Sequence, residues 1–137
     1  MDFHFASAWE VVADKFPNRV ATISDDKPLS WQEFERRASC IASLLEEHGL
    51  GPDSKAGLYL HNCSEYQEAQ FGIFKVGGCP INVNYRYKSD ELVYLLDNSD
   101  AEAVFFQSCY AMRIWEIRER LPKVKLFVQI DDGTESL

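Results

Sequence analysis

The sequence has no long hydrophobic run and no excess of basic residues, and each absence excludes a class of protein. No apolar run approaches the roughly 20 residues that a membrane-spanning helix needs, so we expect no transmembrane segment. Acidic residues number 22 against 14 basic ones, which gives a net charge of −8. This balance argues against a nucleic-acid partner, because phosphate contacts need clustered Lys and Arg. Residues 1–4 have neither the basic region nor the apolar core of a signal peptide.

Closely spaced metal ligands and cysteine pairs are also missing. The chain has no C-x-x-C pair, and its three histidines show no zinc-binding spacing. We therefore expect no metal site and no disulfide framework, but reduced thiols in a cytoplasmic protein. The four cysteines are Cys40, Cys63, Cys79 and Cys109.

The glycine-rich fingerprints of nucleotide-binding loops do not occur either. No G-x-G-x-x-G follows a strand and opens a helix, and there is no G-x-x-x-x-G-K-[ST]. The one double glycine, Gly77-Gly78, closes a helical pattern. Its amides therefore do not line a helix N-terminus that could hold a phosphate, and we interpret it as a helix stop.

What the chain does contain is a regular alternation of helical and strand patterns. Hydrophobic residues make up 46% and charged residues 26%, which is ordinary for one globular domain. The predicted strands are short, continuous apolar runs, as expected where helices cover both faces of a sheet. We therefore predict an α/β fold with a mostly parallel sheet flanked by helices. Strands are expected over residues 20–24, 29–30, 57–60, 79–83, 103–106 and 126–130, the first two as a hairpin.

Helix boundaries carry their own signals. Ser30 and Glu33 have the spacing of a capping box, in which the serine accepts a backbone N–H and the glutamate reaches back. Asn62 is expected to cap the next helix, and Ser89 a short helix after it. Gly49 is expected to end the helix that starts after Ser30, in a left-handed conformation.

Three residues follow the predicted buried strand 57–60, where open α/β sheets place their ligands. They are His61, Asn62 and Cys63. A binding role competes with a simpler one, in which Asn62 caps a helix and His61 is a half-exposed edge residue. Cys63 in the first helical turn could have a lowered thiol pKa, or could serve as a small buried hydrophobe.

Arg86 is the principal candidate for a binding residue. It lies between a predicted buried strand and a predicted helix and is flanked by Tyr85 and Tyr87. A loop in this position can expose a guanidinium to a phosphate-bearing ligand, or the arginine can pair with a nearby carboxylate. A later group of basic residues alternates with glutamates and is interpreted as a solvated helix face. These residues are Arg113, Arg118, Arg120, Lys123 and Lys125.

Several short motifs occur in order along almost the whole chain. The clearest are L-S-W-Q-E-F at residues 29–34, N-C-S-E at 62–65 and K-V-G-G-C-P-I-N-V-N at 75–84. Together with the segments 17–21, 49–53 and 86–99, they resemble the N-terminal region of the adenylate-forming ligase superfamily. This superfamily comprises the AMP-forming acyl-CoA synthetases, the luciferases and the adenylation domains of peptide synthetases. Residues 82–87 look most like fatty-acyl or sterol-side-chain CoA ligases.

This resemblance implies a two-step reaction in the complete enzyme. A carboxylic acid, of fatty or sterol type, reacts with ATP and Mg²⁺ to give an acyl-adenylate, and coenzyme A then displaces AMP. The ATP-binding motifs and the C-terminal domain of the family do not match any part of residues 1–137. We therefore expect this chain to be a partial N-terminal subdomain of the large domain, without catalytic residues and inactive alone. By resemblance, Arg86 would contact a phosphate of coenzyme A.

Two other interpretations fit the same sequence. The chain could be a stand-alone protein-interaction module derived from this family, with apolar surface through which copies of the chain could associate. It could also be a small flavodoxin-like or dinucleotide-binding protein, although it lacks the glycine fingerprint.

Overall fold

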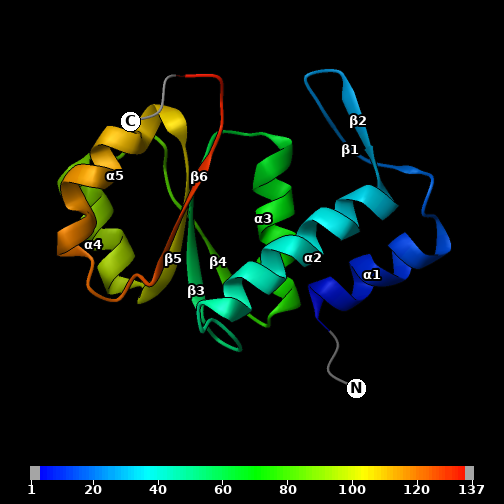
Figure 1. Ribbon diagram of the computed structural model, residues 1–137, viewed down its shortest axis with the longest axis horizontal. Helices are drawn as coiled ribbons and strands as arrows, with labels where there is room; N and C mark the ends of the chain where they lie inside the picture. The colour runs from blue at the N-terminus through cyan, green and yellow to red at the C-terminus, as the bar shows by residue number, and fades with distance from the viewer. Residues whose placement is uncertain (1–3, 135–137) are drawn as a thin grey trace. The chain divides into compact units, whose positions relative to one another are not determined.

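The computed structural model describes residues 4–134 and shows helices and strands in alternation along the chain (Figure 1). Residues 1–3, on which the expectation of no signal peptide partly rests, lie outside the described part. No helix within residues 4–134 is long and apolar enough to cross a membrane. The helices are α1 (Phe5–Lys15), α2 (Trp31–Glu47), α3 (Ser64–Lys75), α4 (Ser89–Asn98) and α5 (Ala111–Ile117). The strands are β1 (Val20–Ser24), β2 (Lys27–Ser30), β3 (Lys55–Tyr59), β4 (Cys79–Asn82), β5 (Ala101–Gln107) and β6 (Leu126–Ile130).

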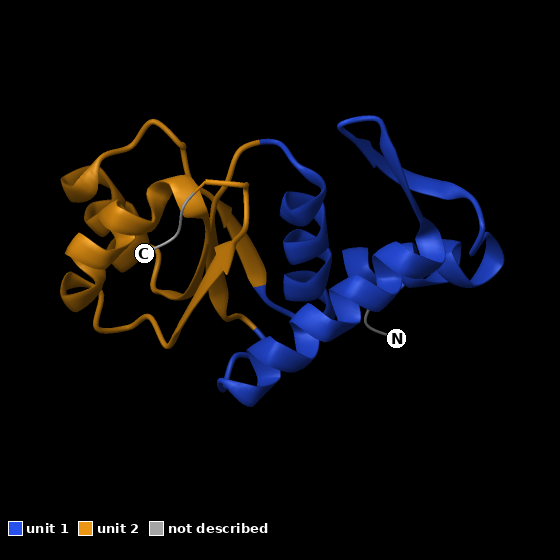
Figure 2. Cartoon of the chain, turned by 45° about the horizontal axis from the view of Figure 1, so that its top comes forward, with its two compact units in different colours: residues 1–52, 62–78 blue, residues 53–61, 79–137 orange. Residues whose placement is uncertain are grey.

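The chain folds as two compact units (Figure 2). The first, unit 1, comprises residues up to Pro52 together with Asn62–Gly78, and therefore holds α1, α2, α3 and the β1–β2 hairpin. The second, unit 2, comprises Asp53–His61 and the residues from Cys79 onward, with strands β3 to β6 and helices α4 and α5.

Unit 1 is built around an aromatic cluster that joins its three helices. The indole of Trp9 on α1 lies with its ring centroid 5.1 Å from Phe71 on α3 and 5.9 Å from Phe34 on α2. Phe34 and Phe71 are themselves buried and 5.1 Å apart. The hairpin turns at Asp25 and Asp26, both in the left-handed conformation that a two-residue hairpin loop requires.

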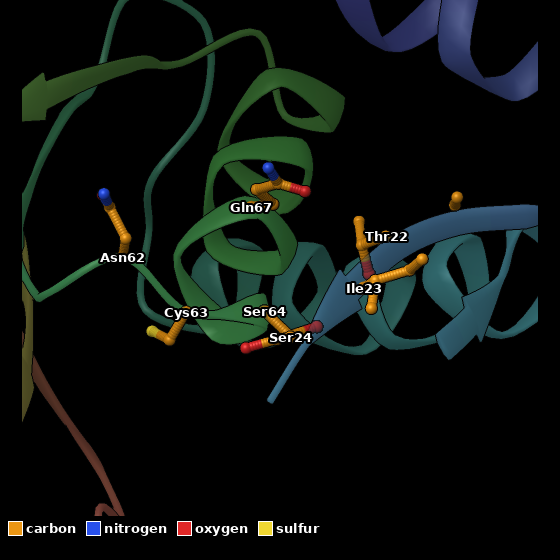
Figure 3. Close-up of a pocket in the computed structure, with 8 residues that line it drawn as sticks. Thr22, Ile23, Ser24, Asn62, Cys63, Ser64 and Gln67 are labelled. Carbon is orange, nitrogen blue, oxygen red and sulfur yellow. The ribbon is translucent and has the colours of Figure 1, made fainter. Parts of the chain in front are cut away.

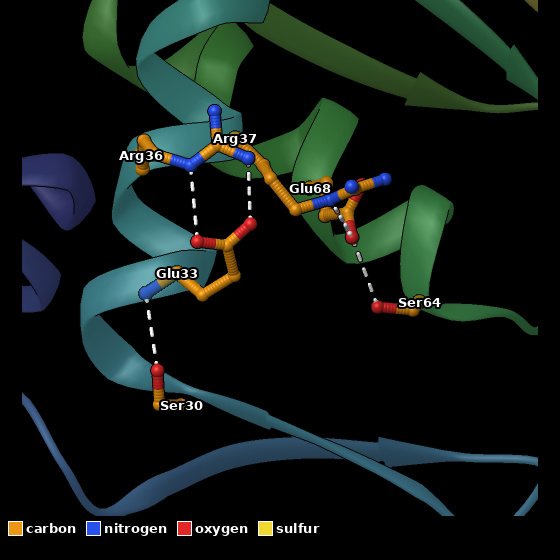
Figure 4. Close-up of polar contacts among 6 residues, drawn as sticks. All are labelled: Ser30, Glu33, Arg36, Arg37, Ser64 and Glu68. Carbon is orange, nitrogen blue, oxygen red and sulfur yellow. Dashed lines mark hydrogen bonds and ion pairs between the residues drawn. The ribbon is translucent and has the colours of Figure 1, made fainter.

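The ends of α2 and α3 confirm most of the predicted signals. Ser30 Oγ accepts the N–H of Glu33 at 3.2 Å, as predicted (Figure 4). The reciprocal half of the capping box is wrong, because the Glu33 carboxylate instead receives two hydrogen bonds from Arg36 one turn later. A charged, two-pronged donor is a stronger partner for a carboxylate than one backbone amide. Gly49 and Gly77 both have a left-handed backbone, with φ of 82° and 79°, and end the two helices.

Helices α2 and α3 approach each other closely at Gly72. A Cβ placed on Gly72 would lie 2.5 Å from Cγ2 of Ile41 and 3.0 Å from the carbonyl oxygen of Ala38. The same pair of helices is joined by a buried carboxylate, since Glu68 accepts hydrogen bonds from Arg37 at 2.8 Å and from Ser64 at 3.1 Å (Figure 4). Because Gly72 has no Cβ, α2 and α3 can come close enough for Arg37 on α2 to pair with Glu68 on α3.

Unit 2 contains a four-stranded parallel sheet with the strand order β4-β3-β5-β6, which confirms the predicted α/β class. Its apolar core involves α4, α5 and β5, through Leu92 and Leu96, Ile114 and Ile117, and Val104 respectively. The predicted cap of α4 is displaced by one residue. Lys88 occupies the N-cap position, and its N–H donates to the Glu91 carboxylate at 3.0 Å, whereas Ser89 is already helical.

We predict that Gly72→Ala lowers the free energy of unfolding by about 1–3 kcal/mol, because its methyl group has no room between the two helices. The matched control is Gly51→Ala, whose Cβ would meet no atom within 4 Å. Urea unfolding followed by tryptophan fluorescence measures both. Equal stability of the two variants would contradict the close approach.

Candidate functional site

The carboxyl ends of the parallel strands form one edge of the sheet in unit 2. Strand β3 pairs with β4 on one side and with β5 on the other. The chain therefore turns to opposite sides of β3 after consecutive strands, which makes the β3–β5 boundary a topological switch point. Open α/β sheets bind their ligands in the crevice outside this point. The residues beyond the four strand ends include His61, the 84–88 loop, Tyr110 and Asp132.

His61 lies at this switch point, as its position after β3 predicts. Its backbone N–H donates to Oε1 of Gln107, the last residue of β5, at 2.9 Å. Its Nε2 shares a hydrogen bond with the hydroxyl of Tyr110, and its ring meets Tyr85 edge-on at 4.6 Å. His61 is therefore an exposed member of an aromatic cluster that joins the segments after β3, β4 and β5.

A second cluster lies beside the first and holds the 84–88 loop. The hydroxyl of Tyr59, at the end of β3, donates to the backbone carbonyl of Tyr87 at 2.9 Å. Nη1 of Arg113 donates to the same carbonyl at 3.0 Å and to the Tyr59 hydroxyl at 2.6 Å. The ring of Tyr110 stacks on Tyr59 with centroids 4.3 Å apart.

The placement of Arg113 corrects the interpretation of the basic group as a solvated face. Arg113 lies four residues before the buried Ile117, so the two share one side of α5. This four-residue spacing is visible in the sequence and indicates that Arg113 faces the buried side, but the alternation of arginines with glutamates suggested a solvated face instead. Arg120, Lys123 and Lys125 are exposed, as predicted, but Lys123 and Lys125 lie after the helical residues, so the predicted helix face does not extend to them. Their ion pairs are Arg120 with Asp90, Lys123 with Asp97 and Asp100, and Lys125 with Glu102.

Both tyrosines of the cluster keep their protons at neutral pH. Burial raises the pKa of Tyr59, and the hydrogen bond from Arg113 opposes this rise only in part. Burial, with the neighbouring Cys109 and Tyr59, raises the pKa of Tyr110 to about 12. The Tyr59 hydroxyl is therefore available to donate to the 84–88 loop.

Arg86 is exposed in the 84–88 loop, and its side chain lies near the ring of Tyr85. Its backbone N–H donates to Oδ1 of Asn84 at 2.9 Å, and its guanidinium carbon lies 5.6 Å from the ring centroid of Tyr85. No carboxylate in residues 4–134 lies within 4.0 Å of this guanidinium, so the predicted alternative of an ion pair is not found there. The arginine can meet an anion from outside these residues.

Asn62 and Cys63 lie instead in unit 1, beside an open hollow of about 350 Å³ between β1 and the start of α3 (Figure 3). Asn62 does not cap α3, because the extended Cys63 occupies the N-cap position and the helix begins at Ser64. Burial raises the pKa of the Cys63 thiol, so it is not an activated nucleophile. The other polar residues that line this hollow are Thr22, Ser24, Ser64 and Gln67.

Metal-ligand geometry is not found in the described part of the chain. Within residues 4–134 no group of three or more His, Cys, Asp or Glu side chains could hold a metal ion. The four cysteines are unpaired, and Cys40, Cys79 and Cys109 are exposed.

Asp132 secures the segment that follows β6. Its Oδ2 accepts the backbone N–H of Cys109 at 3.0 Å, and its Oδ1 accepts from the N–H and the hydroxyl of Thr134. These bonds, first those from Thr134, hold the pKa of Asp132 well below its ordinary range. A carboxyl group whose pKa is lowered by folding stabilises the folded state at pH values above its pKa in the unfolded chain, about 3.9. This contribution is lost as the pH falls below that value.

We predict that Asp132→Asn makes the melting temperature fall less between about pH 5 and pH 3 than it does in the unmodified chain. Asparagine keeps the size of the side chain and an acceptor oxygen but does not titrate. Asp131→Asn, the same exchange one residue earlier, is the control and should follow the unmodified chain. Parallel acid profiles for the Asp132 variant and the unmodified chain would contradict the assignment.

Comparison with known proteins gives one consistent result. A family model described as "AMP-binding enzyme" matches residues 9–136. A 3-oxocholest-4-en-26-oate–CoA ligase of Rhodococcus rhodochrous is 37% identical over 98% of this chain. A medium/long-chain-fatty-acid–CoA/3-oxocholest-4-en-26-oate–CoA ligase of Mycobacterium marinum is 38% identical over 96% of it. In both cases the chain spans only 24% of the relative's length.

Solved structures agree on the fold. A protein described as a long-chain-fatty-acid CoA ligase from Rhodopseudomonas palustris has a TM-score of 0.89 and 27% identity, over 99% of this chain and 35% of that one. The anthranilate CoA ligase AuaEII in complex with anthranoyl-AMP has a TM-score of 0.88 over 93% of this chain and 25% of its own, at 22% identity.

Proposed function

The chain belongs to the AMP-binding enzyme family, and we propose on this basis that it is the N-terminal portion of an ATP-dependent acyl-CoA ligase. The observation that carries the proposal is the family match over residues 9–136, joined to ligase relatives about four times longer than this chain. The flavodoxin-like alternative has no comparable support.

The proposed complete enzyme uses ATP, Mg²⁺ and coenzyme A. Its first step joins a carboxylate to the α-phosphate of ATP and releases pyrophosphate. In the second step the thiol of coenzyme A attacks the acyl carbon and releases AMP. Residues 1–137 form a partial N-terminal subdomain in this proposal, located in the cytoplasm, and the ATP-binding core and C-terminal domain lie elsewhere.

The proposed substrate is a fatty or sterol-type carboxylic acid. Support comes from the printed activities of the relatives, which name medium- and long-chain fatty acids and 3-oxocholest-4-en-26-oate. The acid is expected to bind mainly to residues outside this chain. The proposed substrate class therefore rests on the similarity to these relatives.

Arg86 is proposed to bind a phosphate of coenzyme A. Three observations support this role: it is exposed, it has no carboxylate partner within residues 4–134, and it follows β4 at the carboxyl edge of the sheet. A guanidinium in such a position suits a phosphate, which it can meet with two parallel N–H donors.

We predict that the purified 137-residue chain forms no AMP from ATP and a fatty acid, because the proposed ATP-binding core lies outside it. Pyrophosphate-exchange and AMP-release assays, with the complete native gene product as positive control, measure this. AMP formation by the short chain would contradict the proposed division of the enzyme.

We predict that Arg86→Ala in the complete gene product raises the KM for coenzyme A by about tenfold or more, the effect of losing one charge-assisted hydrogen bond. ATP–pyrophosphate exchange should be unchanged, because it precedes the coenzyme A step. Arg120→Ala is the control, since that exposed arginine pairs with Asp90. An unchanged KM for coenzyme A would remove Arg86 from the proposed site.

A second candidate is a stand-alone interaction module, favoured by apolar side chains that unit 1 leaves exposed. Phe5 of α1 is 66% exposed and Ile23 of β1 is 70% exposed. Self-association through such surface is part of this candidate. The intact mass of the native gene product separates the two proposals. A mass several times the 15.7 kDa of this chain favours the ligase, whereas an equal mass favours the module.

A further inference from the structure

Two short-range hydrogen bonds lie within the 84–88 loop. The N–H of Tyr87 donates to the carbonyl of Asn84 at 3.0 Å, and the N–H of Arg86 donates to the Asn84 side chain at 2.9 Å. These two bonds define a turn, and its connections to the rest of unit 2 are the ring contact of Tyr85 with His61 and the hydrogen bonds at the Tyr87 carbonyl. Asn84, Tyr85 and Arg86 are all exposed, whereas Tyr87 is half-buried and packs against the apolar core of unit 2.

Two residues distant in sequence anchor the loop at its far end. Arg113 and Tyr59 both donate to the carbonyl oxygen of Tyr87, at 3.0 Å and 2.9 Å. Tyr59 belongs to β3 and is fully buried, so its hydroxyl is a fixed point of the sheet. Arg113 belongs to α5, and its 2.6 Å bond to that hydroxyl joins helix, strand and loop.

The anchor lies one residue from Arg86. Because the Tyr87 carbonyl accepts two donors, the peptide plane between Tyr87 and Lys88 is fixed relative to β3 and α5, and this restricts the backbone of the neighbouring Arg86. The near end of the loop continues directly from β4, through the buried Val83. Arg86 is thus an exposed side chain on a loop fixed at both ends, which lowers the ordering cost of binding.

We propose that Arg113, acting with Tyr59, is a positioning residue that fixes the 84–88 loop so that Arg86 is presented to a phosphate-bearing ligand. Arg113 does not touch the ligand in this arrangement, and its effect passes through the Tyr87 carbonyl. The part of the inference that concerns the ligand rests on the function proposed for Arg86, whereas the part that concerns the loop does not.

The test combines hydrogen exchange with kinetics in the complete native gene product. In Arg113→Ala, the amides of Arg86 and Tyr87 should exchange about tenfold or more faster, and the KM for coenzyme A should rise while kcat and the KM for ATP stay unchanged. Tyr59→Phe keeps the stacked ring and removes only the hydroxyl, so it should give the same pattern. This variant provides the test even if Arg113→Ala does not fold. Arg113→Lys should restore part of the protection.

Arg118→Ala is the matched control, because that arginine stacks on Trp115 at 3.6 Å and makes no contact with the loop. The variant carrying both Arg86→Ala and Arg113→Ala should bind coenzyme A no worse than Arg86→Ala alone. Unchanged exchange at Arg86 and Tyr87 in folded Arg113→Ala and Tyr59→Phe would overturn the positioning role. An Arg86→Ala variant with normal KM, beside faster exchange in Arg113→Ala, would overturn only the proposed ligand.

Discussion

The parallel pairing of β3 with both β4 and β5 is the constraint on which the candidate site depends. Parallel strands end at the same edge, so residues far apart in sequence meet there without any local signal to join them. His61, the 84–88 loop and Tyr110 come together because each follows a strand of this one sheet. The order β4-β3-β5-β6 then places the switch point at β3, where Tyr59 supplies a buried hydroxyl.

Local signals predicted the helices and strands, but several strand bounds differ by one or two residues, as for β2 (Lys27–Ser30, predicted 29–30) and β3 (Lys55–Tyr59, predicted 57–60). The strand over 126–130 was predicted with its observed bounds, and Gly49 and Gly77 have the left-handed backbone expected of helix ends. Errors arose where two local partners competed for one group. The sequence position of Glu33 fits both a capping box and an ion pair with Arg36, and the two charged donors of Arg36 are the stronger partner. Asn62 is a better cap than Cys63 by residue type, yet the backbone turns into the helix one residue later.

The candidate site was only half visible in the sequence. Arg86 could be identified because it follows a strand, in a loop rich in tyrosine, and position relative to a strand is a local property. The role of Arg113 depends on a tyrosine 54 residues earlier and on a backbone carbonyl, a group that every residue possesses. The spacing of Arg113 and Ile117 could have placed the arginine on the buried side of its helix, but no pattern of residue types can identify a backbone carbonyl as its acceptor.

The contrast between Arg86 and Arg113 supports the binding role proposed for Arg86. In a chain with a net charge of −8, carboxylates are plentiful, and they pair with Arg36, Arg37 and Lys75 among others. Arg113 instead binds neutral oxygens and keeps its whole charge close to the 84–88 loop. Arg86 stands in the same part of unit 2 without a carboxylate partner in residues 4–134. Neither guanidinium pairs with a carboxylate within residues 4–134, which supports the proposal that an anionic ligand binds at this edge of the sheet.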